Sequence, residues 1–446
     1  MDSERAGNED VIQELGPSLR ALLEFERFHL QDVDTFQNTS RDPSFDRRYL
    51  PQNCGAIRLP CFWIPRKYLH VYGHYARDAI EFSLVRGEGL EQSVLFPIHP
   101  LSLHLYRELL STTNAREVAA DGPCVWAVPT SSVRTFLAWP DSQPQKAVFL
   151  KTSLHSKAFG DRRLHRRKVC SSVGLSGLVT AATAALPEAL RYFPENIGFV
   201  PRSMSDSGAI VRSIPREISN NDAYVAPLFA LTSERSNGLP LLLRLARNQG
   251  LPPLEFMEQV LCAPVARWWL HMAMRHGFIV EAHGQDLLLG LTPDLRSSGQ
   301  TYYRDFEGLA VDWELRSHQG LRTPDDMPGA AAWHDTYASW EYRGSQMLFY
   351  KLMLSLSDYL DLVLAPINRS LVTWQQRGLL GQSSIHEDDL AGLFSRYLFD
   401  ELAKLFNVNP GSCFNVAQSR ARFIGLLLKL RQRLVVGSRA KVTVPH

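Results

Sequence analysis

The apolar pattern of this chain changes its period near residue 220, and this change limits the folds that the chain can adopt. Between about residues 55 and 160, short runs of β-branched and aromatic residues alternate with turns, which predicts a sheet. Beyond residue 220, apolar residues recur at helical spacing. We therefore expect an α+β protein in which a mixed sheet lobe packs on a largely helical lobe. The strand-like runs are CFWI, VLFPI, CVWAV, VRTFLAW, AVFLKTSL and GAIVRSI.

The helical pattern predicts several helices and a division of the chain. A strand-like insertion, GFIVEAHGQDLLLGL, interrupts the helical half. The division that we expect is an N-terminal region at 1–90, a sheet lobe at 91–220 and a helical lobe at 221–446. The predicted helices span residues 11–28, 174–193, 239–249, 254–277, 343–365, 388–406 and 414–435.

Composition and charge exclude several classes of protein. Hydrophobic residues make up 45% and charged residues 21%, which excludes a disordered chain. The formal net charge is only +2, so attraction to nucleic acid would need a local patch. No apolar stretch approaches the roughly 18 to 20 residues that span a bilayer, and the N-terminus is acidic, unlike a signal peptide. We therefore expect a cytoplasmic protein with no membrane partner and no nucleic acid partner. The six cysteines are scattered, so we also expect no zinc site.

Two segments in the second half gather acidic side chains. In IVEAHGQD, residues 279–286, an extended backbone would place Glu281, His283 and Gln285 on one face. In YRDFEG, residues 303–308, acidic side chains lie within an aromatic frame. Glu281 and Asp305, with Asp286 close by, are ligands of the kind that Mg²⁺ takes when it is shared with nucleotide phosphates. A surface hairpin with solvated charges is the alternative interpretation.

Cations and hydroxyls gather upstream. PTSSVRT, residues 129–135, surrounds Arg134 with hydroxyls, and Lys151 ends the apolar run AVFL, a combination that suits a triphosphate. The basic run at 161–168 has no interleaved aromatic residues, so a solvated face is favoured over a nucleic-acid patch. His99, between two prolines in FPIHP, favours a structural role. The P-loop, Rossmann and nucleophile-elbow fingerprints do not occur in the sequence.

Taken in order, the motifs of the chain resemble those of the NRPS-independent siderophore (NIS) synthetases, the aerobactin-synthetase-like IucA/IucC family. The motifs are FPIHP, PTSSVRT, Lys151 with Arg163 twelve residues later, AIVRSIP, EAHGQDLLL and YRDFEG, over roughly residues 95 to 310. The resemblance implies a cupped hand with a reduced thumb at 1–90, a fingers sheet at 91–220 and a helical palm at 221–446. It also implies binding of ATP and Mg²⁺.

The same resemblance implies an ATP-dependent ligase of siderophore biosynthesis and iron acquisition. Such an enzyme adenylates a polycarboxylic acid, citrate or a related acid, and passes it to an amine or alcohol, releasing AMP and pyrophosphate. A homodimer is common in that family. The implied roles are catalysis by Lys151, Arg163, His283 and Gln285; ATP binding by Ser132, Arg134, Thr135, Lys151, Arg163, Arg212 and Asp286; metal binding by Glu281 and Asp305; and substrate binding by His99, Arg163 and His283.

Departures from the family pattern keep two other functions open. Asp286 stands where Asn is usual, Ala158 and Phe159 replace an Ile-Thr step, and the chain before PTSSVRT is shorter than in typical members. One alternative is a kinase-like small-molecule phosphotransferase, because HGQDLLL followed by DFE is similar to a kinase pattern and would yield ADP. The other is a catalytically weak homologue that binds nucleotide or a partner. The presence of Arg134, Lys151 and Arg163 favours the ligase.

Overall fold

The computed structural model describes residues 10–27, 49–51, 54–73, 85–86, 92–118, 125–141, 143–155, 163–182, 190–234, 238–322, 345–380, 385–386, 388–409 and 413–436. The chain forms two compact units. The first consists of Met1–Ala181, Tyr192–Ala226 and Asp305–Glu307, and the second of Ala182–Arg191, Pro227–Arg304 and Gly308–His446. The short turn at 305–307 thus belongs to the first unit, although both its flanks belong to the second. The α+β class is confirmed, whereas the division at residues 90 and 220 stays a prediction.

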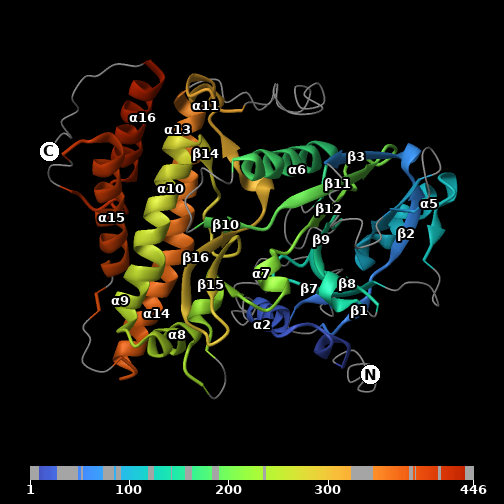
Figure 1. Ribbon diagram of the computed structural model, residues 1–446, viewed down its shortest axis with the longest axis horizontal. Coiled ribbons are helices and arrows are strands. Elements are labelled where there is room, and N and C mark those ends of the chain that lie inside the picture. Colours follow the sequence, from blue (N-terminus) through green and yellow to red (C-terminus); the bar gives the residue numbers. More distant parts are fainter. Residues whose placement is uncertain are drawn as a thin grey trace. The chain divides into compact units, whose positions relative to one another are not determined.

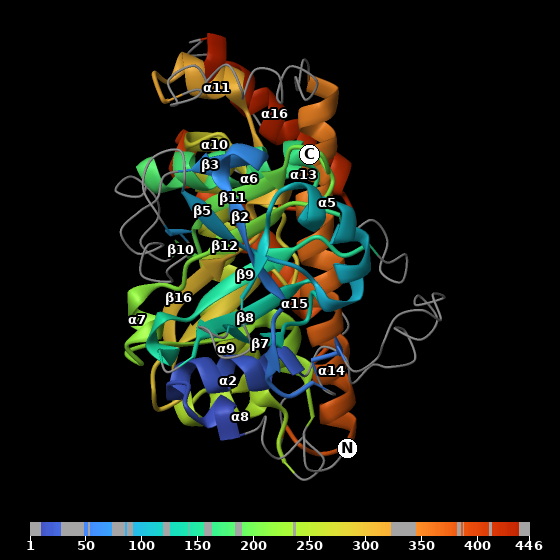
Figure 2. The ribbon, with the colours of Figure 1, turned by 90° about the vertical axis from the view of Figure 1, so that its right-hand side faces the viewer.

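A seven-stranded antiparallel sheet forms the centre of the first unit (Figures 1 and 2). The predicted strand runs at CVWAV, VRTFLAW, AVFLKTSL and GAIVRSI are confirmed within it. A second, four-stranded sheet holds the runs CFWI and VLFPI. In spatial order the large sheet is β1 (Ile57–Arg58), β7 (Val125–Pro129), β8 (Thr135–Pro140), β9 (Val148–Thr152), β12 (Ala209–Arg212), β11 (Glu195–Pro201) and β3 (Leu69–Gly73); the small one is β4 (Val85–Arg86), β5 (Ser93–Pro97), β2 (Cys61–Pro65) and β6 (Arg116–Glu117).

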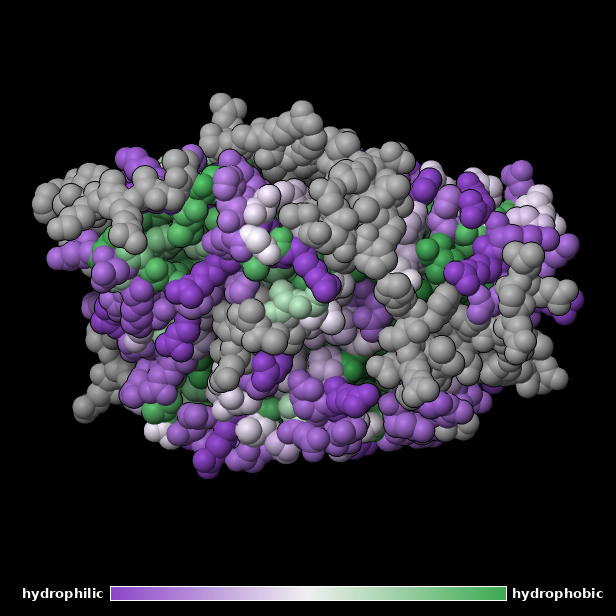
Figure 3. All heavy atoms as spheres, turned by 45° about the horizontal axis from the view of Figure 1, so that its top comes forward, coloured by the Kyte–Doolittle hydropathy of each residue, from purple (hydrophilic) through white to green (hydrophobic). Residues whose placement is uncertain are grey.

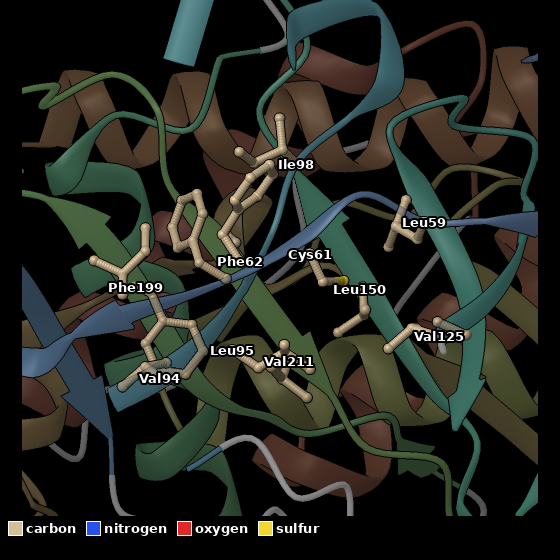
Figure 4. Close-up of a cluster of buried hydrophobic side chains, with 14 of the residues drawn as sticks. Leu59, Cys61, Phe62, Val94, Leu95, Ile98, Val125, Leu150, Phe199 and Val211 are labelled. Carbon is tan, nitrogen blue, oxygen red and sulfur yellow. The ribbon is translucent and has the colours of Figure 1, made fainter. Parts of the chain in front are cut away.

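The core of the first unit lies between these two sheets (Figure 4). Phe62 and Leu95 from the small sheet and Leu150 and Val211 from the large one belong to a single buried cluster. Because side chains alternate along a strand, the residues next to Leu150 and Val211 point to the opposite face of the large sheet. One of those residues is Lys151.

Helix α6 (Arg166–Ala181) covers part of that opposite face, along β3, β11 and β12 (Figure 1). Val169 and Val173, one helical turn apart, pack with Val200 and Ile210. The prediction of a helix at 174–193 was wrong at both ends. Only the last three residues of the basic run, Arg166, Arg167 and Lys168, lie in the first turn of α6, and the valines that follow them supply the stripe facing the sheet. Residues 190–192 form a strand instead, and 183–189 lie outside the described residues.

Helix α2 (Pro17–Glu26) belongs to the same unit and accounts for most of the predicted helix at 11–28. Pro17 suits its first position, where a backbone N–H has no helical partner. Gly16, before it, is held against Asn221, and a Cβ added there would lie 2.5 Å from the Asn221 amide oxygen. Shorter helical turns complete the unit at η3 (Arg66–Tyr68), η5 (Pro100–Tyr106), α5 (Arg107–Thr112), η6 (Pro144–Lys146) and α7 (Arg216–Ser219).

The second unit is mostly helical, as predicted (Figure 1). Helices α10 and α15 pack together, as do α13 and α16. The helices are η8 (Leu228–Thr232), α8 (Leu241–Gln249), α9 (Pro253–Met257), η9 (Glu258–Cys262), α10 (Ala263–Arg275), α11 (Trp313–His318), α13 (Ser345–Ser357), η13 (Asp358–Leu364), α14 (Ala365–Gln376), α15 (Asp389–Phe406) and α16 (Arg420–Val436).

Two of these helices pass through a proline by way of a π-helical turn. The turn η9 precedes Pro264, and η13 precedes Pro366. Proline lacks an N–H and clashes with the carbonyl four residues before it, and a wider turn relieves both conflicts. The predicted end of a helix at 365 was therefore wrong, because the helix continues to Gln376.

Short strands carry the acidic segments of the second unit. β15 (Leu287–Leu291) and β16 (Ser297–Tyr303) form a hairpin flanked by β10 (Leu190–Tyr192), and β14 (Phe278–Ile279) pairs with β17 (Ala310–Val311). Between β14 and β15 the chain makes a turn, in which the amides of Asp286 and Leu287 donate to the His283 carbonyl. The extended backbone that would place Glu281, His283 and Gln285 on one face is therefore interrupted by a turn from His283 onward. The chain passes between the units after β13 (Tyr224–Pro227) and through η10 (Phe306–Gly308).

The outer surface agrees with the mixed composition. Among the residues that are coloured in Figure 3, hydrophilic side chains predominate, with smaller apolar areas between them. Tyr350 and Leu362 of the second unit are more than half exposed. Among the helices that the structure describes, none combines the length and the apolar character needed to cross a bilayer.

Candidate functional site

Three strands bring buried cations to one face of the large sheet. Lys151 on β9 lies opposite Thr135 on β8 and Ile210 on β12, and Arg212 follows two residues later on β12. Lys151 is 1% exposed and Arg212 is 3% exposed. Arg134 immediately precedes β8 and is also buried. Because a buried charge is costly unless it is paired, the partners of these cations define the site.

The partners are the two carboxylates of the turn at 305–307. Lys151 Nζ lies 2.6 Å from Asp305 Oδ1 and 3.0 Å from Glu307 Oε2. Arg134 Nη2 lies 3.1 Å from Glu307 Oε2, and Lys168 Nζ of α6 lies 2.7 Å from Glu307 Oε1. Arg212 Nη2 is 3.9 Å from Asp305 Oδ1. We call these six residues the ion cluster; all of them belong to the first unit.

The carboxylates of the ion cluster are ionised at neutral pH. Burial alone would raise the pKa of Glu307, but Lys151, Arg134 and Lys168 lower it to about 2. Burial opposes ionisation of Asp305 as well, yet Lys151 and Arg212 hold its pKa far below the ordinary range. Glu195 forms an ion pair with Arg212, in which Arg212 Nη2 lies 2.6 Å from Glu195 Oε1. Four cations thus face three carboxylates, and the excess positive charge suits an anion.

A loop of hydroxyl residues adjoins the ion cluster. This hydroxyl loop, residues 129–135, joins β7 to β8. Ser132 Oγ accepts a hydrogen bond from the Thr135 amide at 3.2 Å, and the Thr130 hydroxyl donates to the Thr135 carbonyl at 3.0 Å. Val133 has φ of +55°, which is uncommon for a β-branched residue, and Asp305 has φ of +80°. Such strain concentrates at ligand sites that the surroundings hold in place.

His99 supports this loop. Its side chain is fully buried, its Nδ1 accepts from the Leu101 amide at 3.1 Å, and its Nε2 donates to the Val133 carbonyl at 3.2 Å. Burial lowers the pKa of His99 to about 4, so the ring is neutral. Both ring nitrogens are therefore used within the protein, which favours the structural interpretation of His99 over substrate binding.

Arg163 lies in different surroundings from the ion cluster. Its Nη1 is 3.0 Å from Asp206 Oδ2, and its side chain is 43% exposed. Asp206 Oδ1 accepts from the Ser207 hydroxyl at 3.2 Å, and His155 Nε2 lies 3.1 Å from the same hydroxyl. The structure therefore does not join Arg163 to Lys151 through any ion pair among the residues that it describes. The departure at Ala158 and Phe159 lies outside those residues.

The second unit carries the histidine motif, which we call the histidine turn (residues 281–286). His283 Nε2 lies 2.9 Å from Asp286 Oδ2, and the Gln285 amide donates to Nδ1 at 3.1 Å. The hydrogen of a neutral ring therefore lies on Nε2, toward Asp286. Burial alone would lower the pKa of His283, but Asp286, Glu281 and Asp358 raise it to about 9. The Gln285 backbone, rather than its side chain, makes this contact.

Glu281 of the histidine turn packs against Gly308, the last residue of η10. A Cβ added at Gly308 would lie 1.9 Å from Glu281 Oε2, so only glycine leaves room for this carboxylate. Asp358 lies within electrostatic reach of His283, and burial raises the pKa of Asp358. Across the described ranges, no three His, Cys, Asp or Glu side chains converge as a ready-made metal site. Any Mg²⁺ here would take one or two carboxylates and complete its shell with phosphate oxygens and water.

Four residues that take part in these networks were not predicted as site residues. Glu307 follows Asp305 by two residues in YRDFEG, and this spacing of two carboxylates was the signal that could have identified it. Lys168 stood in the basic run, and Glu195 and Glu26 had no local signal because their partners are distant in the sequence. Glu26 Oε2 accepts from the Ser131 amide at 3.1 Å, although 105 residues separate the two.

No family model matches this chain, and no curated protein matches its sequence. Solved structures do match it. The petrobactin biosynthesis protein AsbB from Bacillus anthracis has a TM-score of 0.62 and 15% identity, with 90% of this chain and 68% of that protein covered.

Two aerobactin synthetases from Klebsiella pneumoniae match as well. ATP-bound IucA has a TM-score of 0.58 at 18% identity, covering 89% of this chain and 74% of IucA. IucC has a TM-score of 0.57 at 16% identity, covering 80% of this chain and 64% of IucC. The resemblance that the sequence motifs predicted is thereby confirmed at the level of the fold: this chain has the fold of the siderophore synthetases AsbB, IucA and IucC.

Proposed function

We propose that this protein is an ATP-dependent ligase that activates a polycarboxylic acid, citrate or a related acid, and joins it to an amine or alcohol in siderophore or related biosynthesis. The observation that carries the proposal is the ion cluster, on a fold shared with ATP-bound IucA. The buried Arg134 and Lys151 and the partly exposed Lys168 converge on the carboxylate oxygens of Glu307. Phosphate oxygens carry the same kind of charge and accept the same hydrogen bonds.

The reaction we propose has two displacements. A carboxylate oxygen of the acid attacks the α-phosphorus of ATP, the bond to pyrophosphate breaks, and an acyl-adenylate forms. The nucleophile then attacks the acyl carbon, AMP leaves with the bonding electron pair, and the nucleophile loses a proton. Both steps need positioning and charge neutralisation more than covalent help. Lys151 and Arg134 are the cations that we assign to the phosphates, with the hydroxyls of Ser132 and Thr135 and the guanidinium of Arg212 in support.

Mg²⁺ fits the donor set of the proposed site. Asp305 offers an ionised carboxylate on a strained backbone, and hard carboxylate oxygens together with phosphate oxygens are what Mg²⁺ prefers. When bound, Mg²⁺ would neutralise the charge of the leaving pyrophosphate. Glu281, which belongs to the second unit, stays a sequence prediction as a metal ligand. Glu307 already contacts three cations, so phosphate groups would compete with it for Lys151 and Arg134.

The charges around His283 favour one of its two predicted roles. With a pKa of about 9, the ring is protonated at neutral pH and attracts a carboxylate. A general base would have to be neutral there. We therefore propose that His283 helps to hold the acid, with Arg163 and Gln285 as further candidates, and that Asp286 balances the charge of the ring. The kinase-like phosphotransferase and the catalytically weak homologue remain the alternatives.

The identity of the nucleotide product tests the proposal. Purified protein is incubated with Mg²⁺, ATP, a panel of di- and tricarboxylic acids and hydroxylamine as a generic acceptor. AMP, pyrophosphate and an acid-dependent hydroxamate are expected. ADP would instead support the phosphotransferase, and ATP binding without turnover would support the weak homologue. Lys151→Ala should abolish hydroxamate formation, whereas Lys146→Ala, on the turn before β9, is the matched control and should retain it.

A further inference from the structure

The N-terminal helix α2 ends in a buried carboxylate that local rules do not explain. Glu26, its last residue, is 1% exposed. Burial penalises an ionised carboxylate, and the C-terminal end of a helix repels negative charge. A neutral or basic residue at this position would make the helix itself more stable. Residues kept against local preference in this way concentrate at functional sites.

Glu26 forms a hydrogen bond to the hydroxyl loop, which contains a strained backbone conformation. Its Oε2 accepts from the Ser131 amide at 3.1 Å, within the hydroxyl loop. That loop holds Val133 at φ of +55°, a conformation that persists only where the surroundings impose it. In the same turn, His99 Nε2 donates to the Val133 carbonyl at 3.2 Å. Glu26 and His99 therefore hold two backbone groups of the strained turn that lie two residues apart.

The turn determines where Arg134 lies. The Arg134 amide donates to the Ser132 carbonyl at 2.7 Å, and the Arg134 carbonyl accepts from the Thr152 amide at 2.9 Å. Its guanidinium reaches Glu307 at 3.1 Å. A shift of Ser131 would be transmitted through this short turn to Ser132 and Arg134, the residues proposed to bind the nucleotide.

Helix α2 is itself fixed to the same unit. The Ser18 amide donates to the Asn221 amide oxygen at 3.1 Å, and Leu19, Leu22 and Leu23 are buried. The carboxylate at the other end of the helix is thus presented from an anchored element. This makes Glu26 a fixed support for the loop, because a carboxylate on a loosely held segment could not impose a backbone conformation.

We propose that Glu26 is a positioning residue of the nucleotide site: from helix α2, it holds the hydroxyl loop in the strained conformation that places Ser132 and Arg134 for the phosphates. The proposal rests on the proposed function only in taking ATP as the ligand. It gives helix α2, for which the sequence predicted no site residue, a role in the proposed nucleotide site.

The test compares Glu26→Ala, Glu26→Gln and the control Glu24→Ala, which changes an exposed residue of the same helix. Affinity for a non-hydrolysable ATP analogue with Mg²⁺ is measured by calorimetry on the full chain. Glu26→Ala loses a charge-assisted hydrogen bond and should weaken binding about tenfold. Glu26→Gln keeps an acceptor oxygen, so it should recover most of the loss, and Glu24→Ala should bind like wild type.

Hydrogen exchange separates positioning from general destabilisation. In Glu26→Ala, amides at 130–135 should exchange faster, while the strands β9 and β12 keep their protection. If both Glu26 variants bind the analogue as tightly as Glu24→Ala, or if protection falls equally throughout the sheet, the positioning role is wrong. If wild type itself does not bind the analogue, the proposed function fails; the exchange result at 130–135 then still decides whether Glu26 holds the loop.

Discussion

The two units hold their charged motifs in opposite electrostatic settings. In the ion cluster of the first unit, carboxylates are outnumbered by cations, and the pKa values of Asp305 and Glu307 are lowered. In the histidine turn of the second unit, a single imidazole is surrounded by carboxylates, and its pKa is raised to about 9. The first setting attracts anions such as phosphates, whereas the second attracts cations and tolerates a carboxylate only through His283 itself.

The two sites also differ in how the chain builds them. The ion cluster joins residues from 134 to 307 through the register of β8, β9 and β12. The histidine turn is local, since His283 and Asp286 are three residues apart. A substitution in the cluster should therefore affect both the fold and ATP binding, whereas a substitution in the turn should mainly affect charge.

Lys151→Ala should produce the largest effect. It leaves two partly buried carboxylates without the buried ammonium that they share, and breaking a buried ion pair costs up to about 3–5 kcal/mol of unfolding free energy. Removing one electrostatic stabiliser of the transition state should also lower kcat at least about a hundredfold. Urea unfolding and the hydroxamate assay measure the two effects. Stability equal to that of Lys146→Ala would mean that the cluster does not support the first unit.

Glu307→Gln should remove much of the acid sensitivity of the first unit. The folded-state pKa of Glu307 is about 2, below its ordinary value of 4.5, so its stabilisation is present above pH 4.5 and is lost as the pH falls toward 2. The linked free energy is on the order of 3 kcal/mol. Unfolding free energies at pH 6 and pH 3 should differ less in this variant than in wild type.

The exposed Glu108 provides the control for that titration. Glu108→Gln should leave the difference between pH 6 and pH 3 as it is in wild type. An unchanged pH dependence in Glu307→Gln would show that other carboxylates, such as Asp305, dominate the acid response.

Asp286→Asn should alter charge with a smaller effect on stability. Asn keeps the shape but removes the nearest negative charge, so the pKa of His283 should fall from about 9 toward its ordinary value of 6.5. In wild type, the raised pKa gives stability below pH 6.5 that is lost as the pH rises through 9. NMR titration of the imidazole measures the shift. A pKa that stays near 9 would assign the effect to Glu281 and Asp358.

The sequence predicted what depends on local pattern. The strands around Lys151 followed from β-branched and aromatic runs. The family resemblance assigned Arg134 and Lys151 to ATP and Asp305 to the metal, and the ion cluster brings these three residues together. It did not predict the assignment of residues 305–307 to the first unit, because that depends on ion pairs across more than 150 residues. The turn at His283 was missed because the alternation that suggested a strand also fits a turn closed by two backbone amides.

Asp206→Asn should give the smallest effect and tests a third setting, in which charges are partly exposed. Arg163 and Asp206 are 43% and 31% exposed, and pairs of this kind contribute about 0–1 kcal/mol. Unfolding free energy should therefore change by less than about 1 kcal/mol. If Arg163 binds the acid, loss of the competing Asp206 charge should lower KM for the acid about two- to threefold and leave KM for ATP unchanged. A change in KM for ATP alone would instead assign Arg163 to the phosphates, and a large loss of stability would make the pair part of the sheet's support, as Lys151 is.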